Sequence, residues 1–133
     1  MGVFIVFFYV GKDVLWLLQL AEKGNCVIVG RGADYILSES ADAFHVFIHA
    51  NMEHRIERVQ RHDGISGEEN RIRRELEVKD HSRGMLYQFF TGRNWGQVSN
   101  YNLSIDTGVF TKTQAMEIIL NAMEKYKGGK NNA

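Results

Sequence analysis

Three arginines recur at intervals of three along one stretch of the chain. They are Arg55, Arg58 and Arg61. A spacing of three keeps neighbouring side chains on a common face of an α-helix. Three guanidinium groups on one face repel one another unless negative charges compensate for them. The stretch is therefore either a clamp for phosphate groups or a solvated charged face that Glu53 and Glu57 neutralise.

A fourth arginine, Arg31, stands between two glycines. It directly follows the apolar run at residues 26–29, which has the composition of a buried strand. Flanking glycines allow unusual backbone dihedrals and a close backbone approach, and a guanidinium can bind phosphate with two parallel hydrogen bonds. Arg31 is therefore a candidate phosphate ligand, and the alternative is a plain turn with an exposed arginine.

Residues 66–83, SGEENRIRRELEVKDHSR, predict a highly charged helix. Its only clear apolar anchors in the middle are Ile72 and Leu76. A helix that is polar nearly all round is either a surface helix or a mobile one. Mobile charged lids exclude water and supply positive charge in phosphoryl-transfer enzymes. On that interpretation residues 62–92 form a helical lid, with Arg55, Arg73 and Arg74 as its arginines.

Asp80 and Arg83 follow at a spacing of three. A carboxylate beside a guanidinium can hold the edge of a base and a phosphate respectively. The same pair can equally be a salt bridge worth less than about 1 kcal/mol. Both interpretations stay open at this point.

Histidine and cysteine patterns do not predict a metal site. The five histidines include the pair His49 and His54, but no zinc-binding spacing is matched, and there is a single cysteine. Cys26, in the middle of a predicted strand, is expected to be a buried core thiol rather than a nucleophile. One cysteine also excludes an internal disulfide framework, so we expect a reduced, cytoplasmic protein.

The charge balance excludes several partners. The chain has 133 residues, with 16 Lys and Arg against 16 Asp and Glu. General binders of nucleic acid or acidic membranes carry a positive excess, so neither partner is expected. Residues 1–10, MGVFIVFFYV, are apolar but too short to span a membrane. We expect a buried strand there, and an exposed one could add to another chain's sheet and give a homodimer.

Short apolar runs alternate with helical patterns along the chain. Runs at 26–29, 44–48 and 103–105 are separated or followed by helical patterns at 13–23, 33–38, 52–63, 66–79 and 111–123. Capping boxes are expected at Ser66 with Glu69 and at Thr111 with Gln114, and a helix stop at Gly92. The alternation predicts an α/β domain with a parallel sheet flanked by helices over residues 1–127, and a disordered tail over 128–133.

Ligands in such sheets bind at the carboxyl ends of the strands. The residues that follow each predicted strand are therefore the ones that should line a site. They are Gly30-Arg31-Gly32, His49-Ala50 and Asp106-Thr107-Gly108.

Four strings, taken together in order and spacing, resemble the cytidylate kinase-like family of P-loop proteins. They are NCVIVGRGADYIL, FIHANMEHRIERVQRHDGIS, KDHSRGMLYQFFTGRNWG and YNLSIDTGVF. The resemblance runs from about Leu20 to Met123. It implies the fold of a P-loop nucleoside monophosphate kinase. It also implies transfer of the γ-phosphoryl group of ATP, bound with Mg2+, to a nucleoside monophosphate such as CMP or dCMP.

The resemblance also implies roles for individual residues. Arg31 would contact the acceptor phosphate, and Arg58 and Arg61 would face the transferred phosphoryl group. Asp80 and Arg83 match the Asp-x-x-Arg that holds the cytosine nucleotide in cytidylate kinases. These roles suit phosphoryl transfer, which depends more on positioning and positive charge than on a nucleophilic side chain.

Three departures from the family pattern bear on these roles. Leu76 stands where cytidylate kinases carry a further arginine, and Gly32 where they carry an aspartate, so the acceptor nucleotide stays open. The sequence G-x-x-x-x-G-K-[ST], which cradles the ATP phosphates, does not occur in the 133 residues. We therefore expect an N-terminally incomplete kinase fold with poor ATP binding, and a non-catalytic nucleotide-binding, anion-binding or protein-interaction module as the alternative.

Overall fold

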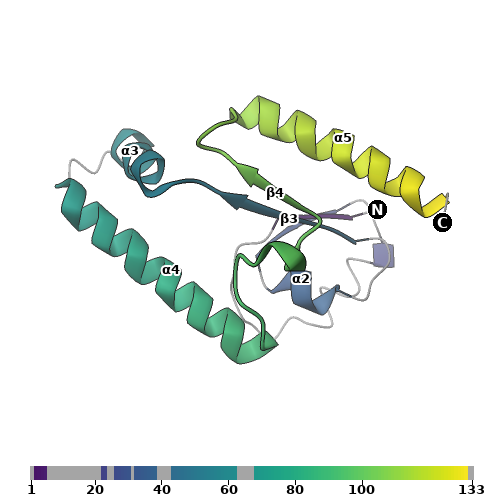
Figure 1. The fold of residues 1–133 in the computed structure, drawn as a ribbon, viewed down its shortest axis with the longest axis horizontal. Helices are drawn as coiled ribbons and strands as arrows, with labels where there is room; N and C mark the ends of the chain where they lie inside the picture. The colour runs from purple at the N-terminus through teal and green to yellow at the C-terminus, as the bar shows by residue number, and fades with distance from the viewer. Residues whose placement is uncertain are drawn as a thin grey trace.

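A four-stranded parallel sheet forms the centre of the molecule (Figure 1). The computed structural model describes residues 2–5, 22–23, 26–30, 32–38, 43–62 and 68–131. The strands are β1 (Gly2–Ile5), β2 (Val27–Val29), β3 (Ala43–His49) and β4 (Leu103–Asp106), in the spatial order β2-β1-β3-β4. The helices are α2 (Ala33–Ile36), α3 (Met52–His62), α4 (Glu69–Thr91), the 3₁₀ turn η1 (Val98–Asn100) and α5 (Lys112–Asn131).

Strand β1 lies inside the sheet. Val3 is in register with Val27 on one side, and Phe4 with His45 on the other. Both backbone edges of residues 2–5 are therefore hydrogen-bonded within the chain. Residues 2–5 thus offer no unpaired edge to another chain's sheet, and the homodimer itself stays a prediction. Residues 6–10 of the apolar start lie outside the described part.

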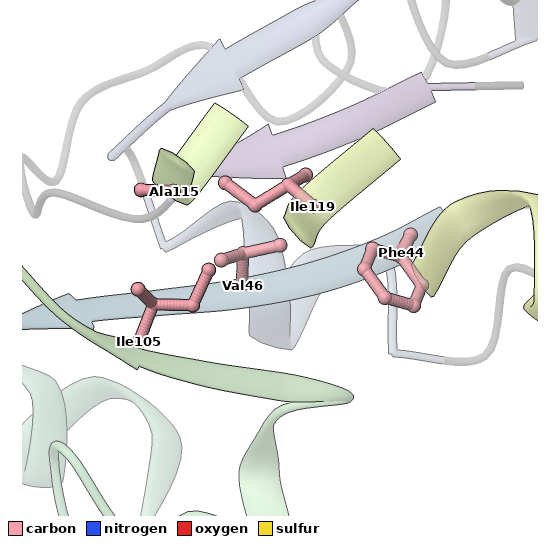
Figure 2. Close-up of a cluster of buried hydrophobic side chains, with 5 residues drawn as sticks. All are labelled: Phe44, Val46, Ile105, Ala115 and Ile119. Atoms are coloured by element: carbon pink, nitrogen blue, oxygen red, sulfur yellow. The ribbon is translucent and has the colours of Figure 1, made fainter. Parts of the chain in front are cut away.

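Successive side chains of β3 point to opposite faces of the sheet and belong to two different hydrophobic clusters. Phe44 and Val46 pack with Ile105 of β4 and with Ala115 and Ile119 of α5, as Figure 2 shows. On the opposite face, Ala43 belongs to a second cluster, whose other members are Ile28 of β2 and Ala33 and Leu37 in and beside α2. Side chains two apart on a strand share a face, so the sequence AFHVFIH serves both cores at once.

The expected elements mostly form. The runs at 26–29, 44–48 and 103–105 are strands, and the patterns at 33–38 and 52–63 contain α2 and α3. The capping box of α5 is present, since the Thr111 amide donates to the Gln114 side chain (3.0 Å) and the Gln114 amide donates to the Thr111 hydroxyl (3.2 Å). Of the helix expected at 13–23, only residues 22–23 are described, and they are helical. Helix α5 continues to Asn131, into the stretch expected as a disordered tail.

Helix α4 differs from its expected form in length and start. It begins at Glu69 with Glu68 as its N-cap and no side-chain capping bond, so the box expected at Ser66 does not mark its start; Ser66 itself lies outside the described residues. The helix then runs unbroken to Thr91. It ends at Gly92, which has a left-handed φ of 70° and whose amide donates a hydrogen bond to the Gln88 carbonyl (2.8 Å). Both features confirm the expected helix stop.

A buried hydrogen bond fastens the C-terminal half of α4 to α2. The Tyr87 hydroxyl donates to Asp34 Oδ2 at 2.5 Å, and the two residues are 0% and 1% exposed. Burial, and then the neighbouring carboxylate, raise the pKa of Tyr87 above its ordinary value. Within the described residues, the other oxygen of Asp34 has no hydrogen-bond partner, so the carboxylate depends on this contact.

Substituting Tyr87→Phe should lower the free energy of unfolding by about 1–3 kcal/mol, because a buried carboxylate loses its donor. Urea denaturation of the full chain measures the change. The matched control is Tyr35→Phe, since Tyr35 is 42% exposed; its effect should stay within about 0.5 kcal/mol. Equal losses in the two variants would contradict the role given to Tyr87.

A second stability test concerns His45, which is 8% exposed on β3. Burial lowers its pKa below the ordinary value of 6.5, and the nearby Asp34 only partly opposes this. As the pH falls through 6.5, His45 is therefore protonated in the unfolded chain before it is protonated in the folded chain. The free energy of unfolding should fall as the pH drops from 7 to 5.5, by at most about 1.4 kcal/mol per pH unit.

Denaturation at several pH values tests this in His45→Gln, which should flatten the slope between pH 7 and 5.5. The exposed His81→Gln is the control and should keep the slope of the original chain. An unchanged slope in His45→Gln would contradict the assignment.

Candidate active site

Two adjoining pockets lie at the carboxyl ends of β3 and β4. The first, which we name pocket A, has a volume of about 270 Å³. Its lining residues are Phe47, Ile48, His49, Ala50, Arg55, Arg58, Asp80, Arg83, Trp95 and Thr107. The second, pocket B, has a volume of about 230 Å³. Its lining residues are His54, Glu57, Arg58, Arg61, His62, Thr107, Phe110, Thr111 and Lys112.

Arg58 and Thr107 line both pockets. Helix α3 starts just after β3, so a spacing of three brings Arg55 and Arg58 to pocket A and Arg58 and Arg61 to pocket B. The predicted common face of the three arginines is thus shared between two neighbouring pockets. Arg58 therefore lies at the boundary of the two pockets.

Asp80 is held by two arginines. Arg55 donates from both terminal nitrogens to the two carboxylate oxygens, at 2.6 and 2.9 Å. Arg83 approaches Oδ1 at 3.5 Å. The side chains of Arg55 and Asp80 are only 26% and 28% exposed, so solvent screens the pair less than a surface pair. The salt bridge that was one interpretation of the Asp80 and Arg83 spacing is therefore formed. Arg55 nevertheless binds Asp80 more closely than Arg83 does.

Pocket A carries three guanidinium groups against one carboxylate, those of Arg55, Arg58 and Arg83 against Asp80. Pocket B carries Arg58, Arg61 and Lys112 against Glu57. The Arg61–Glu57 contact is 3.5 Å long with both side chains more than half exposed, so it neutralises little. Each pocket therefore has an excess of positive charge that suits an anionic ligand.

The loop after β4 contributes Thr107 to both pockets. The Thr107 amide and hydroxyl donate to the His49 carbonyl, at 2.9 and 3.3 Å, and so join the ends of β4 and β3. The Gly108 amide donates to Asp106 Oδ1 at 2.8 Å. A Cβ at Gly108 would lie 3.0 Å from that oxygen, which is a tight contact, and 3.5 Å from His54 Cγ of α3, which is an ordinary van der Waals distance.

The other predicted lid arginines do not reach either pocket. Arg73 contacts Glu53 of α3 at 3.4 Å and Glu69 of its own helix at 3.3 Å, which ties the start of α4 to the start of α3. Arg74 is exposed on α4. Of the three, only Arg55 lines a pocket.

Arg31 lies outside the described residues. The glycines on either side of it are described, and both have left-handed backbones, with φ of 79° at Gly30 and 63° at Gly32. This confirms the conformation for which the flanking glycines were expected. The position of the Arg31 side chain stays a prediction.

Trp95 is a pocket residue that the sequence did not indicate. Its ring meets Phe47 edge-on at 5.7 Å, and Phe47 also packs against Tyr101 at 4.8 Å. A Cβ at Gly96 would lie 3.3 Å from the Phe47 ring, and Gly96 has a φ of 77°, so the Trp-Gly pair of TGRNWG fits closely over β3. That adjacent pair was the available signal. Lys112 of pocket B was also missed, because it appeared only as a first-turn residue of α5.

Metal ligands do not cluster in the described part of the chain, where no group of three or more His, Cys, Asp or Glu side chains could hold an ion. None of the described helices is both long and apolar enough to cross a membrane.

A double-mutant cycle tests the Arg55–Asp80 pair. Arg55→Met, Asp80→Asn and the double variant should give a coupling energy of about 1–2 kcal/mol in urea denaturation, because the pair is bidentate and partly buried. The control cycle uses Arg71 and Glu75, an exposed pair on α4, and should give about 0.5 kcal/mol or less. Equal couplings in the two cycles would show that Arg55–Asp80 acts as an ordinary surface pair.

Known proteins resemble this chain in sequence and in fold. A cytidylate kinase from Methanopyrus kandleri is 25% identical over 114 residues, which cover 80% of this chain and 58% of that protein. A crystal structure of an uncharacterized protein from Eubacterium ventriosum superposes with a TM-score of 0.75 at 23% identity, over 85% of this chain and 63% of that one. This chain thus spans less than two thirds of either. The model of the cytidylate kinase-like family matches residues 8–109, and the chain belongs to that family.

Proposed function

We propose that the chain takes part in transfer of the γ-phosphoryl group of ATP to a nucleoside monophosphate of the CMP or dCMP type. The observation that carries this proposal is the position of Arg58, which lines two positively charged pockets that adjoin each other. A phosphoryl group that passes between two nucleotides needs a cation at the midpoint of its path.

In this proposal pocket A takes the acceptor nucleotide. Asp80 and Arg83 hold the base and the nucleotide, as in the family motif. The longer contact, between Arg83 and Asp80 at 3.5 Å, is the one a base edge would replace. The bidentate contact to Arg55 would keep the carboxylate in place. Arg31, which comes from the loop after β2, would bind the acceptor phosphate.

Pocket B would lie on the donor side, where Arg58, Arg61 and Lys112 face the phosphates of ATP. A phosphate oxygen of the acceptor attacks the γ-phosphorus, and a new P–O bond forms. The bond from that phosphorus to the β,γ-bridging oxygen breaks, and its electron pair stays on the departing ADP. The acceptor phosphate reacts as an anion, so no general base is required.

Magnesium would enter this reaction with ATP rather than from a site built by the described residues. Mg2+ prefers carboxylate and water oxygens in an octahedral arrangement. Asp80, the carboxylate of pocket A, already accepts hydrogen bonds from Arg55 with both of its oxygens. The donor set therefore does not fit a resident metal, and no step is assigned to one.

A coupled assay of ADP formation tests the proposal, with MgATP and CMP, dCMP or UMP. Arg58→Gln should lower kcat/KM by about 100-fold or more, since it removes a donor aimed at the transferred group. The matched control is Arg71→Gln, an exposed arginine of α4 that lines neither pocket, and it should leave the rate unchanged. No turnover above background with any of the three acceptors would overturn the catalytic proposal.

A second candidate is a non-catalytic module that binds a nucleotide or anion in pocket A, whose arginines outnumber its carboxylates. Tryptophan fluorescence separates the two. Trp95 lines pocket A, and Trp16→Phe leaves it as the single tryptophan of the chain. Quenching by CMP together with no turnover would select the module, and no quenching would reject acceptor binding in pocket A altogether.

A further inference from the structure

Asp34 is a buried carboxylate that the proposed reaction does not use. It lies in the first turn of α2, is 1% exposed, and accepts the hydrogen bond of the Tyr87 hydroxyl on Oδ2. Within the described residues its other oxygen, Oδ1, has no hydrogen-bond partner. Burying a carboxylate with so few partners costs free energy that apolar side chains of similar size do not cost. The carboxylate therefore points to a role other than stability.

Tyr101 connects this buried contact to a loop. Its side chain is 9% exposed. Burial, and then the Asp34 carboxylate, raise the pKa of Tyr101 to about 12, whereas hydrogen bonds with Gly96 and Tyr87 oppose the rise. The Tyr101 hydroxyl accepts the hydrogen bond of the Gly96 backbone amide at 3.4 Å. We give the name Asp34 network to the chain of polar contacts formed by Asp34, Tyr87, Tyr101 and the Gly96 amide.

The Asp34 network ends beside Trp95, which lines pocket A. Gly96 directly follows Trp95, and a Cβ at Gly96 would lie 3.3 Å from the Phe47 ring, so the backbone lies against that ring. The Trp95 ring meets Phe47 edge-on at 5.7 Å. Its Nε1 is buried and has no hydrogen-bond partner within the described residues. The position of Trp95 therefore depends on packing and on the backbone beside it, which the Gly96–Tyr101 contact anchors.

Arg93 holds the same loop toward α2. Its guanidinium lies over the ring of Tyr35, a residue of α2, at 5.1 Å from the ring centroid. Burial raises the pKa of Tyr87 and of Tyr101, and the positive charge of Arg93 opposes both rises. Arg93 precedes Trp95 by two residues, so its attraction to the negative charge of the Asp34 network acts on the loop that carries Trp95.

The Asp34 network joins two segments that supply opposite chemical characters to pocket A. Tyr87 belongs to α4, the helix that supplies a carboxylate and an arginine to the pocket. Tyr101 ends η1, in the segment that supplies the aromatic ring of Trp95. We propose that Asp34 is a positioning residue for pocket A, which through Tyr87 and Tyr101 holds Trp95 in place for binding of the acceptor nucleotide. This proposal rests on pocket A as the acceptor site of the proposed function.

Acrylamide quenching of Trp95 fluorescence tests the positioning without a nucleotide. The full chain with Trp16→Phe is used, because Trp95 is then its single tryptophan. Asp34→Leu and Tyr87→Phe should each raise the quenching constant by about twofold or more, because a segment that loses buried polar contacts opens more often to solvent. Asp34→Asn keeps an oxygen that can accept from Tyr87 and should recover most of the difference.

A general loss of stability is controlled by a variant in the other hydrophobic cluster. Ile119→Val removes one carbon from the cluster between α5 and the opposite face of the sheet. It should lower the midpoint of urea denaturation, as Tyr87→Phe does. It should nevertheless leave the acrylamide quenching of Trp95 unchanged, because Ile119 has no part in the Asp34 network.

Titration with CMP, followed by the fluorescence of Trp95, connects the position of the ring to binding. Asp34→Leu and Tyr87→Phe should each weaken CMP binding by about 10-fold, the effect of misplacing one group of a binding site. In the assay of ADP formation the same variants should raise KM for CMP by a larger factor than they lower kcat. Ile119→Val should match the original chain in both measurements.

Three results would overturn the proposal. They are an unchanged quenching constant in both Asp34→Leu and Tyr87→Phe, an equal rise in Ile119→Val, and unchanged CMP affinity in a variant whose Trp95 has become more accessible. Tyr101→Phe replaces Asp34→Leu if circular dichroism shows the latter to be unfolded. If CMP does not quench Trp95 in the Trp16→Phe chain, acceptor binding in pocket A is rejected, and the acrylamide result still decides whether Asp34 positions Trp95.

Discussion

The bidentate ion pair between Arg55 and Asp80 joins the charged helix α4 to α3 beside pocket A, and with the Arg73–Glu53 and Tyr87–Asp34 contacts it positions that helix. The N-terminal half of α4 has few apolar anchors, so polar contacts must supply much of its positioning. Arg58 lies one turn after Arg55, and Arg83 lies one turn after Asp80. The contact between Arg55 and Asp80 therefore helps to place four charged side chains around pocket A.

Much of the fold followed from local patterns. Short apolar runs predicted the three strands after β1, and the pairing of Thr111 with Gln114 predicted the start of α5, because both signals arise from neighbouring residues. The stop of α4 at Gly92 is of the same kind. Elements whose bounds depend on neighbouring residues could therefore be predicted from the sequence.

The arrangement of the site depended on contacts between distant residues. Helical spacing placed Arg55, Arg58 and Arg61 on one face, but it did not show that Asp80 would hold the first of them or that two pockets would share the second. Periodicity likewise describes an apolar strand without its neighbours, so a buried strand was expected at residues 1–10 but not its pairing with β2 and β3. Trp95 was missed because loop residues follow no period that could relate them to a strand.

The strand order has a consequence for how the chain folds. The sheet pairs Val3 with Val27, Gly2 with Ala43 and Val46 with Leu103, so every neighbour is brought in from far along the sequence. Loop closure must precede each pairing, and such high contact order slows folding. The chain contains no proline, so prolyl isomerisation cannot contribute a slow phase. A slow step in refolding would then correspond to the pairing of these distant parallel strands.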